Sequence, residues 1–208
     1  MDKDTLLEEG LKLPVMEEFY SLQGEGYHTG EAAYFIRIGG CDVGCYWCDI
    51  KESWNAELYP AVYTDEIITR VKANPAKAVI ITGGEPLQYN LNYLCDKLQN
   101  LGIKTFLETS GSYPISGKWT WICLSPKKNS PPIDENIKYA NELKIIIAEN
   151  DDFDWAEQYA QKVNKSCLLY LQPEWSKRNE IIPKIVEYIL HNPKWKISLQ
   201  SHKYMKIP

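Results

Sequence analysis

The sequence predicts an α/β fold with a mostly parallel sheet. Along most of the chain, short apolar runs rich in β-branched residues alternate with amphipathic segments, which is the pattern of repeated strand–helix units. Polar residues follow the ends of successive apolar runs, and parallel α/β folds gather such strand ends at one rim. An active site is therefore expected at that rim, and an enzyme is the favoured class of protein.

Seven apolar segments are predicted to be strands, because they are short, β-branched and bounded by turn residues. They span residues 34–38, 78–81, 104–108, 119–124, 143–147, 167–171 and 195–199. The polar sequences TGGEP, ETSG, SPK, QP and QSHK follow five of these strands, beginning at residues 82, 108, 125, 172 and 200. These five sequences supply the candidate site residues at the rim.

Three helices carry sequence signals of their own. Thr64 is predicted to be the N-cap of the first, since Asp65 and Glu66 fall in its first turn. The second is expected to end at Gly102, because glycine readily adopts the left-handed conformation that follows a helix. The apolar faces of the second and third helices comprise Leu91, Leu94, Leu98 and Leu101, and Ile181, Ile182, Ile185 and Ile189.

Composition bounds the class of protein. A chain of 208 residues that is 44% hydrophobic and 25% charged can bury a core of its own, so residues 1–208 are expected to form a single domain. The formal charge of -5 and the dispersed Lys and Arg residues exclude nucleic acid as a partner. The N-terminus lacks a signal peptide, and no run of about 18 apolar residues is present, so we expect a cytoplasmic protein without a membrane segment.

Three of the six cysteines fall within eight residues, in a C-x3-C-x2-C arrangement at Cys41, Cys45 and Cys48. Such clustering points to metal, because three thiolates can reach one ion or one cluster. A closed zinc site needs a fourth ligand, and the nearest histidine, His28, lies well upstream. An iron–sulfur cluster held by three thiolates would leave one iron open to another ligand. The remaining cysteines lie in apolar contexts typical of buried core residues: Cys95, Cys123 and Cys167.

A second motif helps to interpret the cysteine motif. The aromatic Trp47 precedes the last cysteine, and Gly83-Gly84-Glu85-Pro86 follows the next predicted strand. Together they resemble the radical S-adenosylmethionine superfamily. The resemblance implies a [4Fe–4S] cluster whose open iron chelates S-adenosylmethionine, and a 5′-deoxyadenosyl radical that abstracts a substrate hydrogen. It also implies that the Gly-Gly-Glu-Pro segment receives the methionine amino group, where glycines permit close approach and Glu85 supplies negative charge.

Further segments resemble one family within that superfamily, the 7-carboxy-7-deazaguanine synthases. They are FYSLQGEG at 19–26, FIR at 35–37, SPK at 125–127 and LQSHKYMKIP at 199–208. The resemblance implies a reduced partial (β/α) barrel and a lyase that converts 6-carboxy-5,6,7,8-tetrahydropterin to 7-carboxy-7-deazaguanine with loss of ammonia. The product belongs to queuosine-type deazapurine biosynthesis. The resemblance also suggests a homodimer and a flavodoxin-type reductant.

By the same resemblance, the roles divide into two sets, with no protein side chain as the radical-generating group. Substrate-facing residues are Gln23, Gly24, Glu25, Arg37, Thr82, His202 and Pro208 with its terminal carboxylate. Residues facing S-adenosylmethionine are Gly83, Gly84, Glu85, Ser110, Ser125, Lys127 and Gln172. Taken alone, Ser125 and Gln172 are equally typical of strand-end turns, and Lys127 of a solvated surface charge.

One position departs from the family pattern. The family commonly has Thr or Ser after Cys-Asp, where the hydroxyl helps to position Mg²⁺ against the substrate carboxylate, whereas here Ile50 follows Asp49. Isoleucine offers no oxygen, and Mg²⁺ requires nearly octahedral oxygen ligands. We therefore expect Mg²⁺ either to be held through water and Asp49 or to be dispensable, with weak or no stimulation of turnover.

Two rival interpretations remain at this level. A glycyl-radical-activating enzyme would also carry the cysteine and Gly-Gly-Glu-Pro motifs, but it gives no reason for the segments around Gln23 and His202. A non-catalytic zinc- or cluster-binding module would explain the cysteines but not the polar strand ends. Metal content and visible absorbance distinguish the last alternative from an enzyme.

Overall fold

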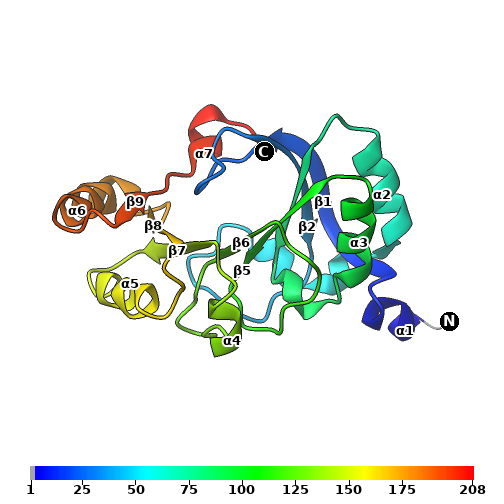
Figure 1. Ribbon diagram of the computed structural model, residues 1–208, viewed down its shortest axis with the longest axis horizontal. Helices are drawn as coiled ribbons and strands as arrows, with labels where there is room; N and C mark the ends of the chain where they lie inside the picture. The colour runs from blue at the N-terminus through cyan, green and yellow to red at the C-terminus, as the bar shows by residue number, and fades with distance from the viewer. Residues whose placement is uncertain (1–2) are drawn as a thin grey trace.

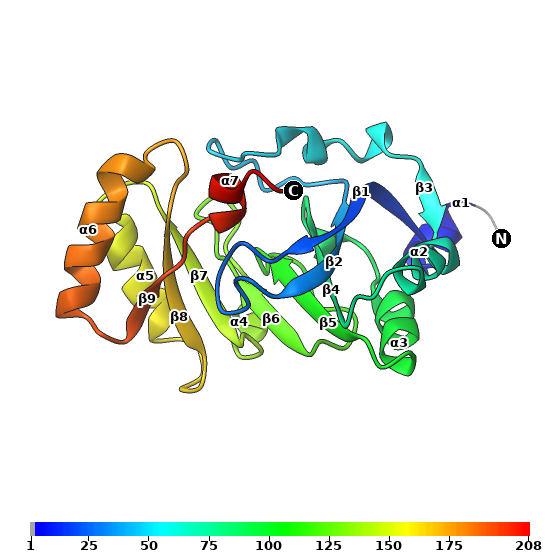
Figure 2. The ribbon, with the colours of Figure 1, turned by 90° about the horizontal axis from the view of Figure 1, so that it is seen from above.

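The computed structural model describes residues 3–208, and most of them are organised around one curved sheet. Its nine strands lie in the order β3-β1-β2-β4-β5-β6-β7-β8-β9, and the seven strands from β2 to β9 run parallel to their neighbours. The sheet is open, since β3 and β9 are its edges, and it is curved (Figures 1 and 2). The prediction of an α/β fold of the partial-barrel type is confirmed.

The seven predicted strands are present, with ends within two residues of those expected. The strands are β1 Lys12–Leu22, β2 Ala32–Ile38, β3 Ala61–Tyr63, β4 Ala78–Gly83, β5 Lys104–Thr109, β6 Trp121–Leu124, β7 Glu142–Ile147, β8 Leu168–Pro173 and β9 Trp195–Ile197. The sequence did not predict β1 and β3, which pair antiparallel at one edge. A bulge between Val15 and Glu17 breaks the alternation of β1, so its sequence lacks the regular period of two.

Helices α2 to α6 lie between strands along the chain, whereas α1 precedes β1 and α7 follows β9. They are α1 Lys3–Glu8, α2 Thr64–Lys72, α3 Asn92–Asn100, α4 Asp134–Ile137, α5 Asp152–Ala160, α6 Arg178–His191 and α7 Ser201–Met205, with short 3-10 turns at Lys51–Trp54, Ala56–Leu58 and Pro86–Gln88. Helices α2 and α3 cover one end of the outer face, and α5 and α6 cover the other (Figure 1). In the described chain, 3–208, no helix combines the length and apolar character needed to cross a membrane.

Two details of the predicted helices are wrong. Thr64 does not cap α2, because Tyr63 takes that position and the buried Thr64 hydroxyl donates to the Gly10 carbonyl at 2.7 Å. Leu101 lies beyond the end of α3 and is 44% exposed, so it does not belong to the buried face that contains Leu94 and Leu98. The predicted stop at Gly102 is confirmed by its left-handed φ of +72°.

The buried apolar residues form two outer cores and a smaller inner one. One outer core lies under α2 and α3, and a second lies under α5 and α6. The inner cluster centres on Phe35, Ile80 and Phe106, with Phe19 and Trp121 packed against it. At the carboxyl ends of the parallel strands the inner face carries polar residues, among them Glu85, Glu108 and Gln172. The segment after β2 and α7 lie at this end of the sheet (Figure 2).

Candidate active site

Two adjoining open hollows lie at the carboxyl ends of the strands, with empty volumes of about 760 and 840 Å³. We call the first the arginine hollow, because Arg37 lies in its wall, and the second the cysteine hollow, because Cys41, Cys45 and Cys48 line it. The wall shared by both hollows comprises Glu25, Cys48, Asp49, Thr82, Gly83, Glu108 and Gln200. Groups bound in the two hollows would therefore meet across this wall.

The loop after β2 carries the three clustered cysteines into the cysteine hollow. Main-chain hydrogen bonds from Gly40 to Ser53 (2.6 Å) and from Cys41 to Trp54 (3.2 Å) hold the loop against the following segment. All three thiols are free and partly exposed. The interpretation of the other cysteines is confirmed, because they are buried in the interior: Cys95, Cys123 and Cys167.

Burial disfavours the thiolate forms of two of the clustered cysteines. Burial raises the pKa of Cys41 to about 11 and also raises the pKa of Cys45, while the nearby Lys127 ammonium opposes the shift at Cys45. Cysteine binds a metal as its thiolate. The bound metal therefore has to stabilise the thiolate forms that burial disfavours. Among residues 3–208, no three His, Cys, Asp or Glu side chains converge as ligands of one ion.

The Gly83-Gly84-Glu85 segment packs directly against the cysteine loop. A Cβ on Gly83 would lie 2.3 Å from the Ile38 carbonyl oxygen, and one on Gly84 would lie 2.0 Å from the Gly40 carbonyl oxygen. The amide of Glu85 donates to the same Gly40 oxygen at 2.8 Å. Only glycine fits at both positions, so the sequence GG fixes the distance between the strand end and the loop.

Glu85 itself is buried, and its carboxylate anchors the end of β5. One oxygen accepts from the Thr109 hydroxyl at 2.5 Å and the Leu87 amide at 3.1 Å. The other accepts from the amide and hydroxyl of Ser110 at 2.8 and 2.5 Å. A carboxylate has about four acceptor positions, and these four donors occupy them. Glu85 therefore acts on the hollow through its charge and by positioning Ser110.

Lys127 faces the cysteine hollow rather than bulk water. Its ammonium donates to the carbonyl oxygen and hydroxyl of Ser125 at 2.5 and 2.6 Å, and it lies 5.6 Å from the centre of the Trp47 ring. Burial lowers the pKa of Lys127. Gln172 is also buried in this wall, where its side-chain oxygen accepts from Ser198 at 2.6 Å. The polar residues predicted around a cofactor thus line one hollow.

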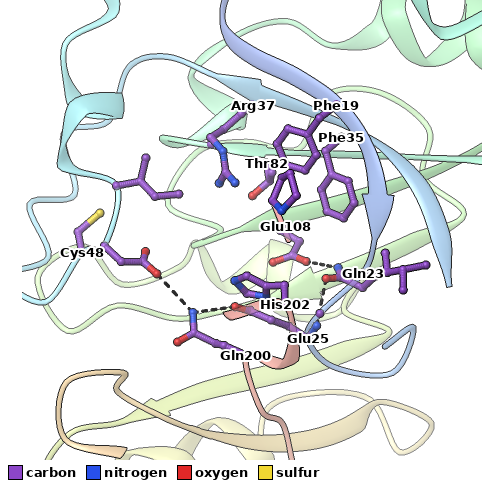
Figure 3. A pocket seen from close by; sticks show the side chains of 16 residues that line it. Phe19, Gln23, Glu25, Phe35, Arg37, Cys48, Thr82, Glu108, Gln200 and His202 are labelled. Carbon is purple, nitrogen blue, oxygen red and sulfur yellow. Dashed lines mark hydrogen bonds between the residues drawn. The ribbon is translucent and has the colours of Figure 1, made fainter. Parts of the chain in front are cut away.

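The arginine hollow brings together residues from both ends of the chain (Figure 3). It contains the predicted substrate-facing residues Gln23, Gly24, Glu25, Arg37, Thr82, His202 and Pro208. The stacked rings of Phe19 and Phe35, 4.9 Å apart, form an apolar wall next to the Arg37 guanidinium. This hollow therefore offers a flat apolar surface, a cation and several hydrogen-bonding groups.

The C-terminal helix closes one side of the arginine hollow. Both the amide and the hydroxyl of Ser201 donate to the Gly24 carbonyl at 2.9 Å. A Cβ on Gly24 would lie 2.2 Å from the His202 ring nitrogen Nδ1, so only glycine permits this contact. Burial lowers the pKa of His202, although the Glu25 carboxylate opposes the shift, and the imidazole is therefore neutral at neutral pH.

Comparison with known proteins identifies the family. The model of the radical SAM superfamily matches residues 35–118. The 7-carboxy-7-deazaguanine synthase of Flavobacterium psychrophilum is 55% identical over 97% of this chain and 96% of its own, and that of Synechocystis sp. is 46% identical over 93% of each. The crystal structure of QueE from Escherichia coli superposes with a TM-score of 0.83 at 28% identity, covering 97% of this chain and 99% of that one. The chain belongs to the 7-carboxy-7-deazaguanine synthase family.

Family membership decides between the interpretations left open by the sequence. A radical SAM enzyme holds a [4Fe–4S] cluster and binds S-adenosylmethionine, and the three thiols, glycine-rich strand end and buried polar groups of the cysteine hollow fit that pair. The rival interpretations, a glycyl-radical activase and a non-catalytic zinc module, are not supported. The interpretation of Lys127 as a solvated surface charge is also wrong, because its ammonium is enclosed by Ser125.

This 7-carboxy-7-deazaguanine synthase family member also has site residues that sequence reasoning did not assign. The ammonium of Lys144, a buried residue of β7, lies 2.5 Å from Glu25 and 3.0 Å from Glu108. Gln23 donates to Glu108 at 2.6 Å, and Gln200 donates to Glu25 at 2.9 Å (Figure 3). Burial alone would raise the pKa of Glu25, but Lys144 and the hydrogen bonds lower it to about 2. The Glu25 carboxylate is thus held ionised in the shared wall.

The residues next to the cysteine loop do not fit the Mg²⁺ site suggested by the family pattern. Asp49 is the one carboxylate directly after the last cysteine, and Lys203 approaches it to 2.5 Å. Ile50, which also lines the arginine hollow, supplies no oxygen. A dication would have to displace the lysine and find its ligands elsewhere.

Proposed function

We propose that this chain converts 6-carboxy-5,6,7,8-tetrahydropterin to 7-carboxy-7-deazaguanine with loss of ammonia. The supporting observation is the pair of hollows joined at the wall that contains Thr82, Gly83 and Glu108. One hollow suits a cluster and its nucleoside cofactor, and the other suits a flat, polar, carboxylated ring. Such a reaction needs both guests in contact and shielded from water.

The cysteine hollow would hold the cofactors. Cys41, Cys45 and Cys48 would hold the cluster, and the cluster with S-adenosylmethionine would supply the radical chemistry that removes a substrate hydrogen. Gly83 and Gly84 allow the methionine part to approach the main chain. Glu85 contributes negative charge toward its amino group. The remaining polar groups of the cofactor meet Ser110, Ser125, Lys127 and Gln172.

The arginine hollow would recognise the pterin. Phe19 and Phe35 cover its ring, while Glu25 and Glu108 accept hydrogen bonds from its ring N–H and amino groups. Both carboxylates can do so because the Lys144 ammonium holds them in place. Further polar contacts come from Gln23, Gly24, Thr82, the neutral imidazole of His202 and the main chain of Pro208.

Arg37 is the cation in this hollow that suits the substrate carboxylate. Its Nε is paired with Glu17 at 2.6 Å, which leaves the terminal nitrogens of the guanidinium directed at the hollow (Figure 3). The fork of an arginine matches a carboxylate in two parallel hydrogen bonds. The C-terminal helix, docked on Gly24, would exclude water behind the bound substrate.

Other properties of the family extend this proposal. A flavodoxin-type donor would reduce the cluster, and the exposed ring of Tyr46, 63% accessible, marks where the cysteine loop reaches the surface. The chain would act in the reducing cytoplasm as a homodimer, as one catalytic domain, in queuosine-type deazapurine biosynthesis. The reductant, the homodimer and the pathway rest on the family resemblance, whereas the cytoplasmic location and the single domain rest on the composition of the chain.

The test is anaerobic turnover of the reconstituted protein. S-adenosylmethionine, a reductant and the carboxytetrahydropterin are added, and 7-carboxy-7-deazaguanine and 5′-deoxyadenosine are measured by mass spectrometry. Product from the wild type but not from Cys45→Ala supports the proposal. 5′-Deoxyadenosine without the deazapurine would preserve the radical chemistry and overturn the pterin assignment.

A further inference from the structure

A lysine neutralises the carboxylate beside the cysteine loop. Lys203 of α7 places its ammonium 2.5 Å from Asp49 Oδ2, and Gln200 donates to the same oxygen at 3.3 Å. The Lys203 side chain is only 20% exposed, whereas Asp49 is 47% exposed. The ammonium also donates to Gln200 at 3.2 Å and lies 4.8 Å from the centre of the Trp175 ring. Lys203 is therefore held in place by groups from three segments.

The surroundings of Asp49 suit a monocation and oppose a dication. Mg²⁺ needs about six oxygen ligands in near-octahedral geometry, and the residue after Asp49 is the apolar Ile50. Within residues 3–208, no further carboxylate, histidine or cysteine pair joins Asp49 to complete a metal site. The fixed ammonium of Lys203 would in addition repel a second cation at close range.

Electrostatics gives this ion pair a role in substrate binding. Asp49 lines both hollows, so an unpaired carboxylate there would repel a substrate that carries a carboxylate of its own. Pairing with Lys203 removes that negative charge and leaves Arg37 as the cation directed at the arginine hollow. The shared wall can thus bind an anionic substrate without a metal ion.

We infer that Lys203 replaces Mg²⁺ in this chain: it is a positioning residue that neutralises Asp49 and fixes α7 against the cysteine loop, so that the anionic pterin binds without a divalent ion. The identity of the substrate in this inference rests on the proposed function. The metal part does not, because it concerns only Asp49, Ile50 and Lys203.

The metal part is tested by Mn²⁺ binding, which needs no turnover. The reconstituted holoenzyme with S-adenosylmethionine is titrated with Mn²⁺, and free Mn²⁺ is followed by electron paramagnetic resonance. Wild type is expected to leave Mn²⁺ free at micromolar concentrations. The double variant Ile50→Thr/Lys203→Met restores a hydroxyl and removes the ammonium, so it should bind one Mn²⁺ per chain. One tightly bound Mn²⁺ in the wild type would overturn the inference, whatever the activity assay shows.

Turnover then tests the positioning role. Lys203→Met should raise the KM for the pterin about tenfold with kcat changed less than twofold, Lys203→Arg should restore most of the loss, and the exposed Lys206→Met should behave as wild type. Added Mg²⁺ should stimulate the double variant but not the wild type. A several-fold loss of wild-type activity after removal of divalent ions would overturn the inference while leaving the proposed reaction intact. Absence of deazapurine from every variant would instead count against the proposed function.

Discussion

The Lys144 ammonium lies on the inner face of the curved sheet, 2.5 Å from a carboxylate oxygen of Glu25. Lys144 is 3% exposed and belongs to β7, whereas Glu25 comes from the loop between β1 and β2, more than a hundred residues earlier. A second carboxylate, Glu108, lies 3.0 Å from the same ammonium. One buried cation therefore holds the two acidic groups that face the proposed substrate.

Replacing Lys144 by methionine should destabilise the protein strongly. The change removes the buried cation from two partly exposed carboxylates, Glu25 and Glu108, and breaking a buried ion pair typically costs about 3–5 kcal/mol. Denaturant unfolding of Lys144→Met measures the loss. The matched control is Lys196→Met on β9, an exposed lysine that should change the free energy of unfolding by less than about 0.5 kcal/mol. Equal stability of the two variants would mean that the buried pair contributes nothing.

Gly84→Ala should prevent stable cluster binding. The added Cβ would lie 2.0 Å from the Gly40 carbonyl oxygen, so the strand end and the cysteine loop must separate. Overpacking of this kind costs about 1–3 kcal/mol. Iron content and visible absorbance after reconstitution measure the effect. Gly30→Ala is the control, because its Cβ meets nothing within 4 Å although its φ is +88°; normal iron content in both variants would contradict the packing argument.

The parallel strands could be predicted because each is a short, buried, β-branched run, such as 78–81 before the Gly83-Gly84 turn. Strand β1 could not, since Glu17 and Glu18 interrupt it at a bulge and its partner is non-local. The prediction of an N-cap at Thr64 was wrong for a similar reason. Its hydroxyl takes a tertiary partner, the Gly10 carbonyl, and no local pattern reveals that choice.

The site was predictable where motifs are contiguous and hidden where partners are distant. The cysteines and Gly83-Gly84-Glu85 are local signals, and the structure brings them into one hollow. Lys144 carried a usable signal, because a lysine inside an apolar strand needs a partner. Its partners Glu25 and Glu108 come from other segments, so only the fold reveals the triad.

His202 predicts a pH dependence of stability. Burial lowers its pKa in the folded protein below the ordinary value of 6.5, so the unfolded chain binds the proton more readily. The stabilisation is complete above pH 6.5 and is lost as the pH falls below it. Guanidinium unfolding at pH 7.5 and pH 5.5 should show a smaller decrease for His202→Gln than for the wild type. An identical decrease in both proteins would show that the imidazole is not desolvated.

Lys127 should tune the cluster through its charge. Its ammonium is enclosed between Ser125 and Trp47 and opposes the rise in the pKa of Cys45, so it stabilises negative charge in the cysteine hollow. Reduction adds negative charge to a cluster, and Lys127→Met should therefore lower the reduction potential by about 59 mV, a tenfold change for one electron. Lys128→Met is the control, because that exposed ammonium is already paired with Asp151 and Asp152 at 2.9 and 2.6 Å. Redox titration of both variants measures the effect. A lower potential in Lys127→Met alone would follow from the enclosure of that ammonium in the hollow. Equal potentials in the two variants would mean that the Lys127 charge is screened from the cluster.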